Sequence, residues 1–258
     1  MLHIALVIIA HQFVICYADC DMANKYNRIL LKLSGEQLAG GKHHGIDPEY
    51  IAKLATEIKS VADSGVQIAI VVGGGNFIRG AEFAGHGIER APADYMGMLS
   101  TVLNGMALTD MLEHAGIPTR LQTSIEMKQI TEPFIRKRAL RHMDKGRVVV
   151  IAGGIGKPYM TTDTAAVTYA LELDCQVVLK ATNVDGVYDK DPHKHDDATR
   201  YDSIGFQEAV ENPEIKVMDK AAIGLAMEQA KPILVFDVNQ NGNLLKITQG
   251  EKIGTLVS

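Results

Sequence analysis

Four clusters of glycine, lysine and hydroxyl-bearing residues each follow a short apolar run, and each has the composition of an anion site. They are Lys32-Leu33-Ser34-Gly35, Gly73-Gly74-Gly75 with Arg79, residues 153–163 and residues 180–191. Successive glycines let the backbone approach a ligand and present N–H groups to it. Arg79 adds a planar guanidinium suited to phosphate. We interpret the clusters as parts of a phosphate site, although the glycines alone would also fit a tight turn.

The third cluster is similar to a P-loop but lacks two residues that such a loop requires. A Walker A motif needs glycine five positions before Gly156 and a hydroxyl residue after Lys157, whereas Ile151 and Pro158 stand there. The Thr-Thr-Asp sequence at 161–163 precedes a helical stretch instead. Hydroxyl groups and free N–H groups at a helix start bind anions. An ordinary N-cap would explain one of these three residues equally well.

The sequence allows two roles for each of two charged residues, Lys32 and Asp191. Lys32 follows the apolar residues 29–31, so it is either exposed at a sheet edge or directed into a site, where its charge meets a phosphate. Asp191 precedes a proline, which fits either a site residue or an Asx turn. The sequence contains no Ser/His/Asp order and no pair of glutamates that would indicate hydrolysis.

Composition narrows the class of protein. The chain has 258 residues, a formal net charge of −5 and a pI near 6, which argues against a surface that coats nucleic acid. Its three cysteines are odd in number and have no metal-ligand spacing, so we expect a reduced, cytoplasmic setting. The nine histidines show no metal-binding pattern either. We predict neither a nucleic-acid partner, nor a membrane partner, nor a protein-bound metal.

The first 21 residues differ from the rest. Residues 2–18 are apolar, but they lack the positive segment of a signal peptide, and His11 and Gln12 interrupt them. The run is also short for a membrane span, which needs about 20 apolar residues. Met22 follows and opens a more ordinary start. We predict that residues 1–21 are a misplaced start or a dispensable tail, and that residues 22–258 form a single domain.

Apolar strands alternate with helical stretches from residue 28 onward. Asp47 and Pro48 have the types preferred at an N-cap and a first helical position, and Gly65 ends the helix that they open. The Asn-Gly pair at 241–242 favours a terminal hairpin. This alternation predicts an α/β fold with a mostly parallel sheet covered on both faces. We expect strands at 29–33, 66–72, 147–152, 176–181 and 233–238, and helices from 47, at 93–115, 132–143, 163–173 and 217–229.

Taken together, these motifs resemble the bacterial uridylate kinases of the amino-acid-kinase superfamily. The resemblance covers residues 26–258. It rests on the strings at 30–36, 73–80, 94–99, 104–105, 161–166, 179–187 and 216–219.

The resemblance implies a three-layer α/β/α sandwich, a homohexamer, ATP and UMP as substrates, and Mg²⁺ accompanying ATP. It also implies activation by GTP and inhibition by UTP. Four sets of residues follow from it. The ATP set is Lys32, Leu33, Ser34, Gly35, Gly75, Arg79, Thr182, Tyr188 and Asp191. The UMP set is Gly74, Asp94, Ile155, Gly156, Lys157, Pro158, Tyr159, Met160, Thr161 and Thr162. The GTP loop is Gly40, Gly41, Lys42, His43, His44 and Gly45, and the catalytic set is Lys32, Arg79 and Asp163.

The chemistry of such a reaction requires no general base. The acceptor is a phosphate monoester with a second pKa of about 6, so it is already largely dianionic at neutral pH. Catalysis then depends on positioning and on charge stabilisation of an in-line displacement. We assign Lys32 and Arg79 to the transferring phosphoryl group. The resemblance implies that Asp163 orients these cations and that Asp94 contacts the ribose.

Several residues depart from the family pattern. Where the family commonly has Gly-Thr-Gly-Asn-Pro-Phe-Phe, this chain has Gly154-Ile155-Gly156-Lys157-Pro158-Tyr159-Met160. Lys157 either contacts a phosphate or points to solvent, and Ile155 offers only its backbone for a polar contact. Gln176 stands where relatives often carry an acidic residue. Two other functions stay open, namely a kinase of the same superfamily that acts on a carboxylate or carbamate, and a non-catalytic nucleotide-binding protein of the same fold.

Overall fold

The computed structural model describes residues 24–78, 87–192, 194–215 and 217–258. Within these residues, nine strands form one sheet in the order β4-β3-β5-β2-β1-β6-β10-β11-β9. Every neighbouring pair is parallel except β10 and β11. Strands β7 (Val187–Tyr188) and β8 (Arg200–Tyr201) form a separate antiparallel pair. The strands of the large sheet are β1 (Arg28–Leu33), β2 (Gln67–Val72), β3 (Thr119–Thr123), β4 (Glu132–Pro133), β5 (Val148–Ala152), β6 (Val177–Thr182), β9 (Ser203–Ile204), β10 (Ile233–Asp237) and β11 (Thr255–Val257).

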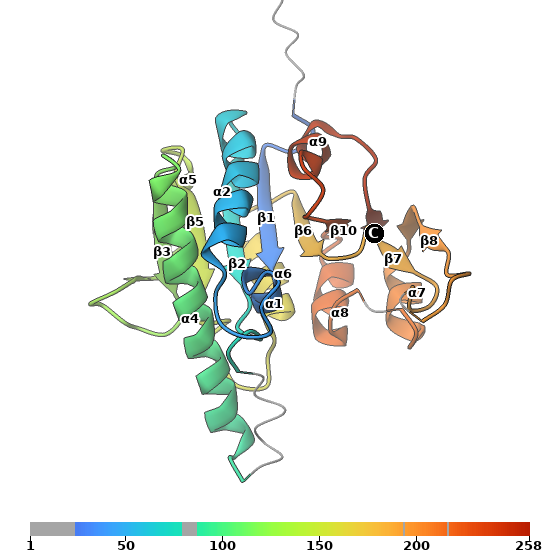
Figure 1. Cartoon of the computed structure of the whole chain (residues 1–258), viewed down its shortest axis with the longest axis horizontal. Helices are drawn as coiled ribbons and strands as arrows, with labels where there is room; N and C mark the ends of the chain where they lie inside the picture. Colours follow the sequence, from blue (N-terminus) through green and yellow to red (C-terminus); the bar gives the residue numbers. More distant parts are fainter. Residues whose placement is uncertain (1–23, 79–86, 193, 216) are drawn as a thin grey trace, which may run out of the picture.

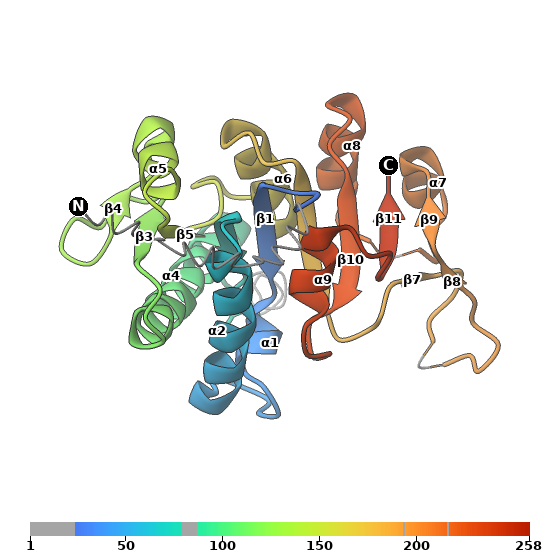
Figure 2. The ribbon, with the colours of Figure 1, turned by 90° about the horizontal axis from the view of Figure 1, so that it is seen from above.

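Helices cover both faces of the sheet, as Figure 2 shows. One face packs against α2 (Pro48–Asp63), α4 (Arg90–His114) and α9 (Asn243–Gln249). The other packs against α5 (Arg136–Met143), α6 (Thr162–Glu172), α7 (Phe206–Glu211) and α8 (Lys220–Glu228). The short helix α1 (Gly35–Leu38) begins directly after β1 (Figure 1). This arrangement confirms the predicted three-layer α/β/α sandwich.

The side chains of β1 alternate between the two faces of the sheet. Ile29, Leu31 and Leu33 belong to the core under α2, whereas Leu30 belongs to the core under α6. Because side chains alternate along a strand, Lys32 points to the same face as Leu30. The buried central strands thus deliver one lysine to the α6 side of the sheet, at the carboxyl end of β1.

The predicted start of α2 is confirmed in detail. The Asp47 carboxylate accepts a hydrogen bond from the Glu49 N–H at 3.1 Å, and Pro48 is the first helical residue. Five apolar residues of the helix are then buried against the sheet, namely Ile51, Leu54, Ala55, Ile58 and Val61.

Two predictions about elements were wrong. The expected helix at 132–143 begins only at Arg136, because Glu132 and Pro133 pair with β3 as a short edge strand. The expected hairpin at 241–242 is instead the start of α9. Gly242 adopts a left-handed conformation there, and Leu244, Ile247 and Thr248 recur at helical spacing on a buried face. No helix in the described part of the chain is both long and apolar enough to cross a membrane.

Candidate active site

Two lysines and one aspartate meet on the α6 side of the sheet, at the carboxyl ends of the two central strands. Lys32 on β1 and Lys180 on β6 are direct register partners, so their side chains leave the sheet side by side. Asp163, in the first turn of α6, lies between them. Its Oδ1 is 2.6 Å from the Lys32 Nζ, and its Oδ2 accepts a hydrogen bond from the Lys180 Nζ at 3.1 Å. We call these three residues the phosphoryl centre.

Burial and charge act against each other at this centre. Burial raises the pKa of the Asp163 carboxyl, but the charges of Lys32 and Lys180 outweigh it and hold that pKa below its usual range. Burial also lowers the pKa of the Lys180 ammonium, and the nearby Lys32 lowers it further, against the opposing effect of Asp163. Lys32 and Lys180 place two ammonium groups beside the shared Asp163, and Asp219 is a second anion that acts on Lys180. An ammonium group held in this way can bind a phosphate oxygen.

Asp219 connects the helices that surround this centre. As N-cap of α8 it accepts a hydrogen bond from the Ala222 N–H at 2.9 Å. The same carboxylate accepts hydrogen bonds from the hydroxyl groups of Thr161, the N-cap of α6, and of Thr164. The N-termini of α6 and α8 are therefore held together beside Lys180. A cavity of about 260 Å³ adjoins them, with Asp163, Lys180 and Asp219 in its wall.

Gly73 and Gly74 of the triple-glycine loop pack so closely against their neighbours that side chains there would have no room. A Cβ on Gly74 would lie 2.7 Å from the carbonyl oxygen of Gly97 in α4. Asn104 of α4 supports the loop by donating to the Gly73 carbonyl at 2.7 Å and by pairing with the Asn76 side chain. Buried amide pairs of this kind fix a single loop conformation, because breaking them leaves polar groups unsatisfied.

A cavity of about 430 Å³ lies between the glycine loop, the start of α4 and the segment before α6. Many of the residues assigned from the sequence line it. They are Lys32, Ser34, Gly35, Gly74, Gly75, Asp94, Ile155, Lys157, Met160, Thr161 and Thr162. Its volume lies in the range of small-molecule sites. Residues far apart in the sequence therefore form one cavity that has Lys32 in its wall.

Asp94 connects the start of α4 to residues 155–160, which we call the acceptor loop. Its two carboxylate oxygens lie 2.8 and 2.9 Å from the Arg90 Nε, and Oδ2 also accepts from the Tyr159 N–H at 2.8 Å. The Arg90 guanidinium lies 5.8 Å from the centre of the Tyr159 ring. Tyr159 has φ = 67°, a left-handed conformation that costs a residue with a Cβ about 1–2 kcal/mol. We call Arg90, Asp94 and Tyr159 the acceptor clasp.

Several predicted residues do not line this cavity. Gly156, Pro158 and Tyr159 belong to the acceptor loop but are not part of the cavity wall. Leu33 is fully buried in the core under α2. Thr182 ends β6 and donates to the carbonyl groups of Val184 and Phe236.

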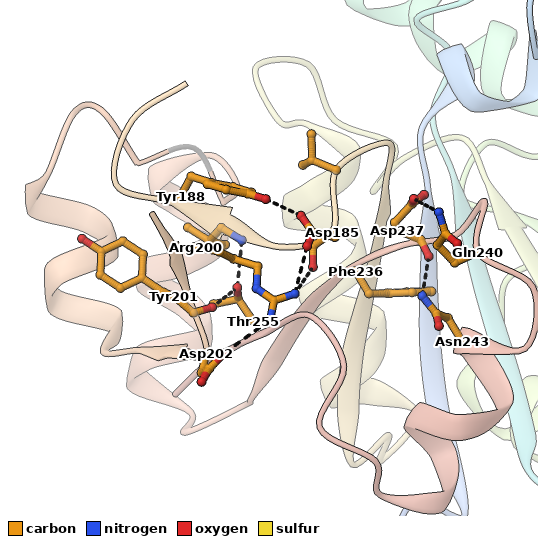
Figure 3. A network of polar contacts seen from close by, with 12 residues as sticks. Asp185, Tyr188, Arg200, Tyr201, Asp202, Phe236, Asp237, Gln240, Asn243 and Thr255 are labelled. Carbon is orange, nitrogen blue, oxygen red and sulfur yellow. Dashed lines mark hydrogen bonds and ion pairs between the residues drawn. The ribbon is translucent and has the colours of Figure 1, made fainter. Parts of the chain in front are cut away.

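Tyr188 lies in β7, outside the main sheet, and belongs to a polar network shown in Figure 3, whereas Asp191 lies in the segment between β7 and β8. The Tyr188 hydroxyl donates to the Asp185 Oδ1 at 2.5 Å, and this carboxylate raises the pKa of the tyrosine. Arg200 of β8 donates to the other oxygen of Asp185 at 3.0 Å. Two strands outside the main sheet thus hold Tyr188 in place.

The predicted GTP loop, residues 40–45, is a mostly exposed turn after α1. It is tied to the glycine loop through Asn76, whose side chain donates to the Gly45 carbonyl at 2.7 Å. The His44 ring also packs edge-on against Phe77, with 5.6 Å between the ring centres. Arg79 lies outside the described residues.

Sequence reasoning assigned no role to three residues of this site, namely Lys180, Asp219 and Arg90, although Lys180 opens the cluster at 180–191 and Asp219 closes the string at 216–219. The signal for Lys180 was present, because it follows an apolar strand just as Lys32 does. Asp219 and Arg90 occupy ordinary helix-start positions, and only their contacts distinguish them. Among the described residues, no group of three His, Cys, Asp or Glu side chains is placed to hold a metal ion.

The chain belongs to the amino acid kinase family, whose model matches residues 27–237. Its fold is similar to that of a UMP kinase from Bacillus anthracis, with 37% identity and a TM-score of 0.86 over 90% of this chain and 96% of that one. A UMP kinase from Ureaplasma parvum is 32% identical, with a TM-score of 0.83 over 90% and 98%. A uridylate kinase from Archaeoglobus fulgidus is 27% identical, with a TM-score of 0.66 over 89% and 99%.

Proposed function

We propose that this protein is a UMP kinase that transfers the γ-phosphoryl group of ATP to UMP and yields ADP and UDP. The observation that carries the proposal is the phosphoryl centre beside a cavity closed by the acceptor loop. The two bacterial UMP kinases, which match at 37% and 32% identity over nearly their whole length, support it.

The proposed reaction needs charge stabilisation rather than proton removal. A phosphate oxygen of UMP attacks the γ-phosphorus, a new P–O bond forms, and the bond to the β,γ-bridging oxygen breaks as ADP leaves with its electron pair. Lys32 and Lys180 stabilise the negative charge that spreads over the equatorial oxygens. Asp163 fixes both ammonium groups, so they need not reorganise during the reaction.

We assign the acceptor nucleotide to the cavity of about 430 Å³. Its phosphate approaches Lys32, and Asp94 faces the ribose. ATP approaches from the side of the glycine loop and Tyr188. Mg²⁺ would arrive with ATP, because this ion keeps several waters and is commonly bound through substrate phosphates.

Self-association is part of the proposal. Tyr95, Leu99, Leu103 and Met106 are each at least 40% exposed and follow one another at helical spacing along α4. An exposed apolar stripe of this kind is typical of an interface between subunits. It supports the homohexamer that the family resemblance implies. Regulation by GTP and UTP and a cytoplasmic location stay predictions from the sequence.

An assay of ADP release with UMP, CMP, AMP and N-acetylglutamate in parallel tests the function. We expect release with UMP and little with the others. Release with acetylglutamate alone would favour a carboxylate kinase, and no release with any acceptor would favour a binding protein.

The role of the phosphoryl centre is tested in the same assay. Lys32→Ala should lower kcat by at least about a hundredfold, as loss of a contact to transition-state charge does. Lys59→Ala is the matched control, since Lys59 pairs with Asp63 on the surface of α2. Equal rates for the two variants would remove Lys32 from the mechanism.

A further inference from the structure

We infer that Arg90 is a positioning residue that holds Asp94 in the orientation that reads the sugar of the acceptor nucleotide. The inference rests on the proposed function, because it assigns a role within the acceptor site. Arg90 lies in the first turn of α4, one turn before Asp94, and both line the same cavity.

The geometry of the clasp differs from that of an ordinary surface ion pair. The Asp94 side chain is only 10% exposed, although the Arg90 side chain is 44% exposed. Arg90 approaches with Nε alone, and its terminal nitrogens have no hydrogen-bond partner in the described part of the chain. Asp94 is therefore a nearly buried carboxylate whose charge is balanced by one cation at the cavity wall. Without that cation the carboxylate would be free to turn away from the cavity.

The contacts of Asp94 leave little room for a ligand. A carboxylate offers about four acceptor positions. The Arg90 Nε faces both oxygens and the Tyr159 N–H takes a position on Oδ2, so the free position lies on Oδ1. One free position accepts one hydroxyl group, in a fixed direction. The clasp is thus suited to distinguish a ribose from a sugar that lacks the hydroxyl at that point.

Arg90 also joins Asp94 to the acceptor loop, because its guanidinium faces the Tyr159 ring. The left-handed conformation of Tyr159 points its N–H at Asp94 and its ring at Arg90. Removing Arg90 would loosen both contacts at once. Removing an ion pair elsewhere on α4 would affect neither.

The test compares kcat/KM for UMP with kcat/KM for its 2′-deoxy and 3′-deoxy analogues. We expect the intact protein to prefer UMP over one analogue by about 10- to 100-fold, as a hydrogen bond to a charged group provides. Arg90→Met should lower that preference at least about fivefold toward the value of Asp94→Asn, and its loss with UMP should appear more as a raised KM than as a lowered kcat. Arg90→Lys, which keeps the charge, should recover part of it.

Arg120→Met is the control, because Arg120 pairs with Glu113 at the far end of α4. A preference in Arg90→Met equal to that of the intact protein would overturn the inference, and so would an intact protein that accepts both deoxy analogues as well as UMP. If Arg90→Met does not fold, Arg90→Gln is judged by the same criteria. Failure of the intact protein to phosphorylate UMP would instead overturn the proposed function.

Discussion

The phosphoryl centre and the acceptor clasp lie at one edge of the same sheet, yet they are built differently. In the phosphoryl centre the three side chains are at most 17% exposed, and each projects from a central strand or from the first turn of a packed helix. In the acceptor clasp Asp94 is only 10% exposed, but Arg90 is 44% exposed, and Tyr159 is 69% exposed and strained. The core fixes all of the phosphoryl centre, whereas two of the three residues of the clasp lie at the surface. We therefore expect changes in the phosphoryl centre to affect both stability and kcat, and changes in the acceptor loop to affect mainly UMP binding.

The largest effect should come from Asp163→Asn. This change keeps the shape but leaves two buried ammonium groups without their counter-charge, and breaking a buried pair in this way typically costs about 3–5 kcal/mol. We expect a loss of that order in the free energy of unfolding, measured with urea, and at least about a hundredfold loss of kcat. The double change Asp163→Asn with Lys180→Met should recover part of the stability. A stability equal to that of the unchanged protein would mean that the centre is not fixed by its charges.

The second effect concerns pH. Burial lowers the pKa of Lys180, so its ammonium group loses its proton at a lower pH than an ordinary lysine, whose pKa is 10.5. The charge that faces the phosphoryl group is present below that pKa and lost as pH rises through it. We expect kcat/KM for ATP, which reports the free enzyme, to fall on the alkaline side below pH 10.5.

Lys180→Arg is the comparison for this prediction, because arginine keeps its charge at every pH of the assay. In Lys180→Arg, the alkaline fall of kcat/KM for ATP should move to higher pH. An identical fall in both proteins would assign the titration to another group.

A smaller effect is expected from Lys157→Asn, which restores the residue common in the family. Lys157 is exposed in the acceptor loop and has no partner in the described part of the chain. An exposed charge contact is worth about 0.2–1 kcal/mol, so we expect kcat/KM for UMP to fall about two- to fivefold at low salt and less at high salt. Lys145→Asn, before β5 at the opposite edge of the sheet, is the control. A salt-independent change would point to a packing effect instead.

The smallest effect should come from Tyr159→Gly. Glycine adopts the left-handed conformation freely, which removes about 1–2 kcal/mol of strain, but it costs about 0.5–1 kcal/mol of backbone entropy. We expect a stability gain of about 0–1.5 kcal/mol in thermal or urea unfolding. Tyr159→Ala keeps the Cβ and should show no gain, which makes it the matched comparison. An equal gain in both variants would mean that the ring, and not the backbone, is the unfavourable feature.

The sequence by itself determined the local elements and the membership of the family. The apolar run of β1, the Asp47 cap with Pro48, and the glycine loop after β2 each depend on neighbouring residues, so local physics was sufficient for them. It was not sufficient at Asn241-Gly242, where a turn signal is compatible with both a hairpin and a helix start. The burial of Leu244 and Ile247 under the sheet decided for the helix. Glu132 likewise precedes a helical stretch, but pairing with β3 made it a strand.

Only the tertiary structure decided which charged residues work together. Lys32 and Lys180 become neighbours because β1 and β6 pair in parallel register. The sequence of neither strand predicts that register. Asp94 and Tyr159 are 65 residues apart, and the contact between them depends on how α4 crosses the sheet edge. The four sequence clusters indicate a phosphate site because they contain the residue types that bind phosphate. The pairing of charges depends on packing between distant segments, so the partners of Lys180, Asp219 and Arg90 emerged only from the fold.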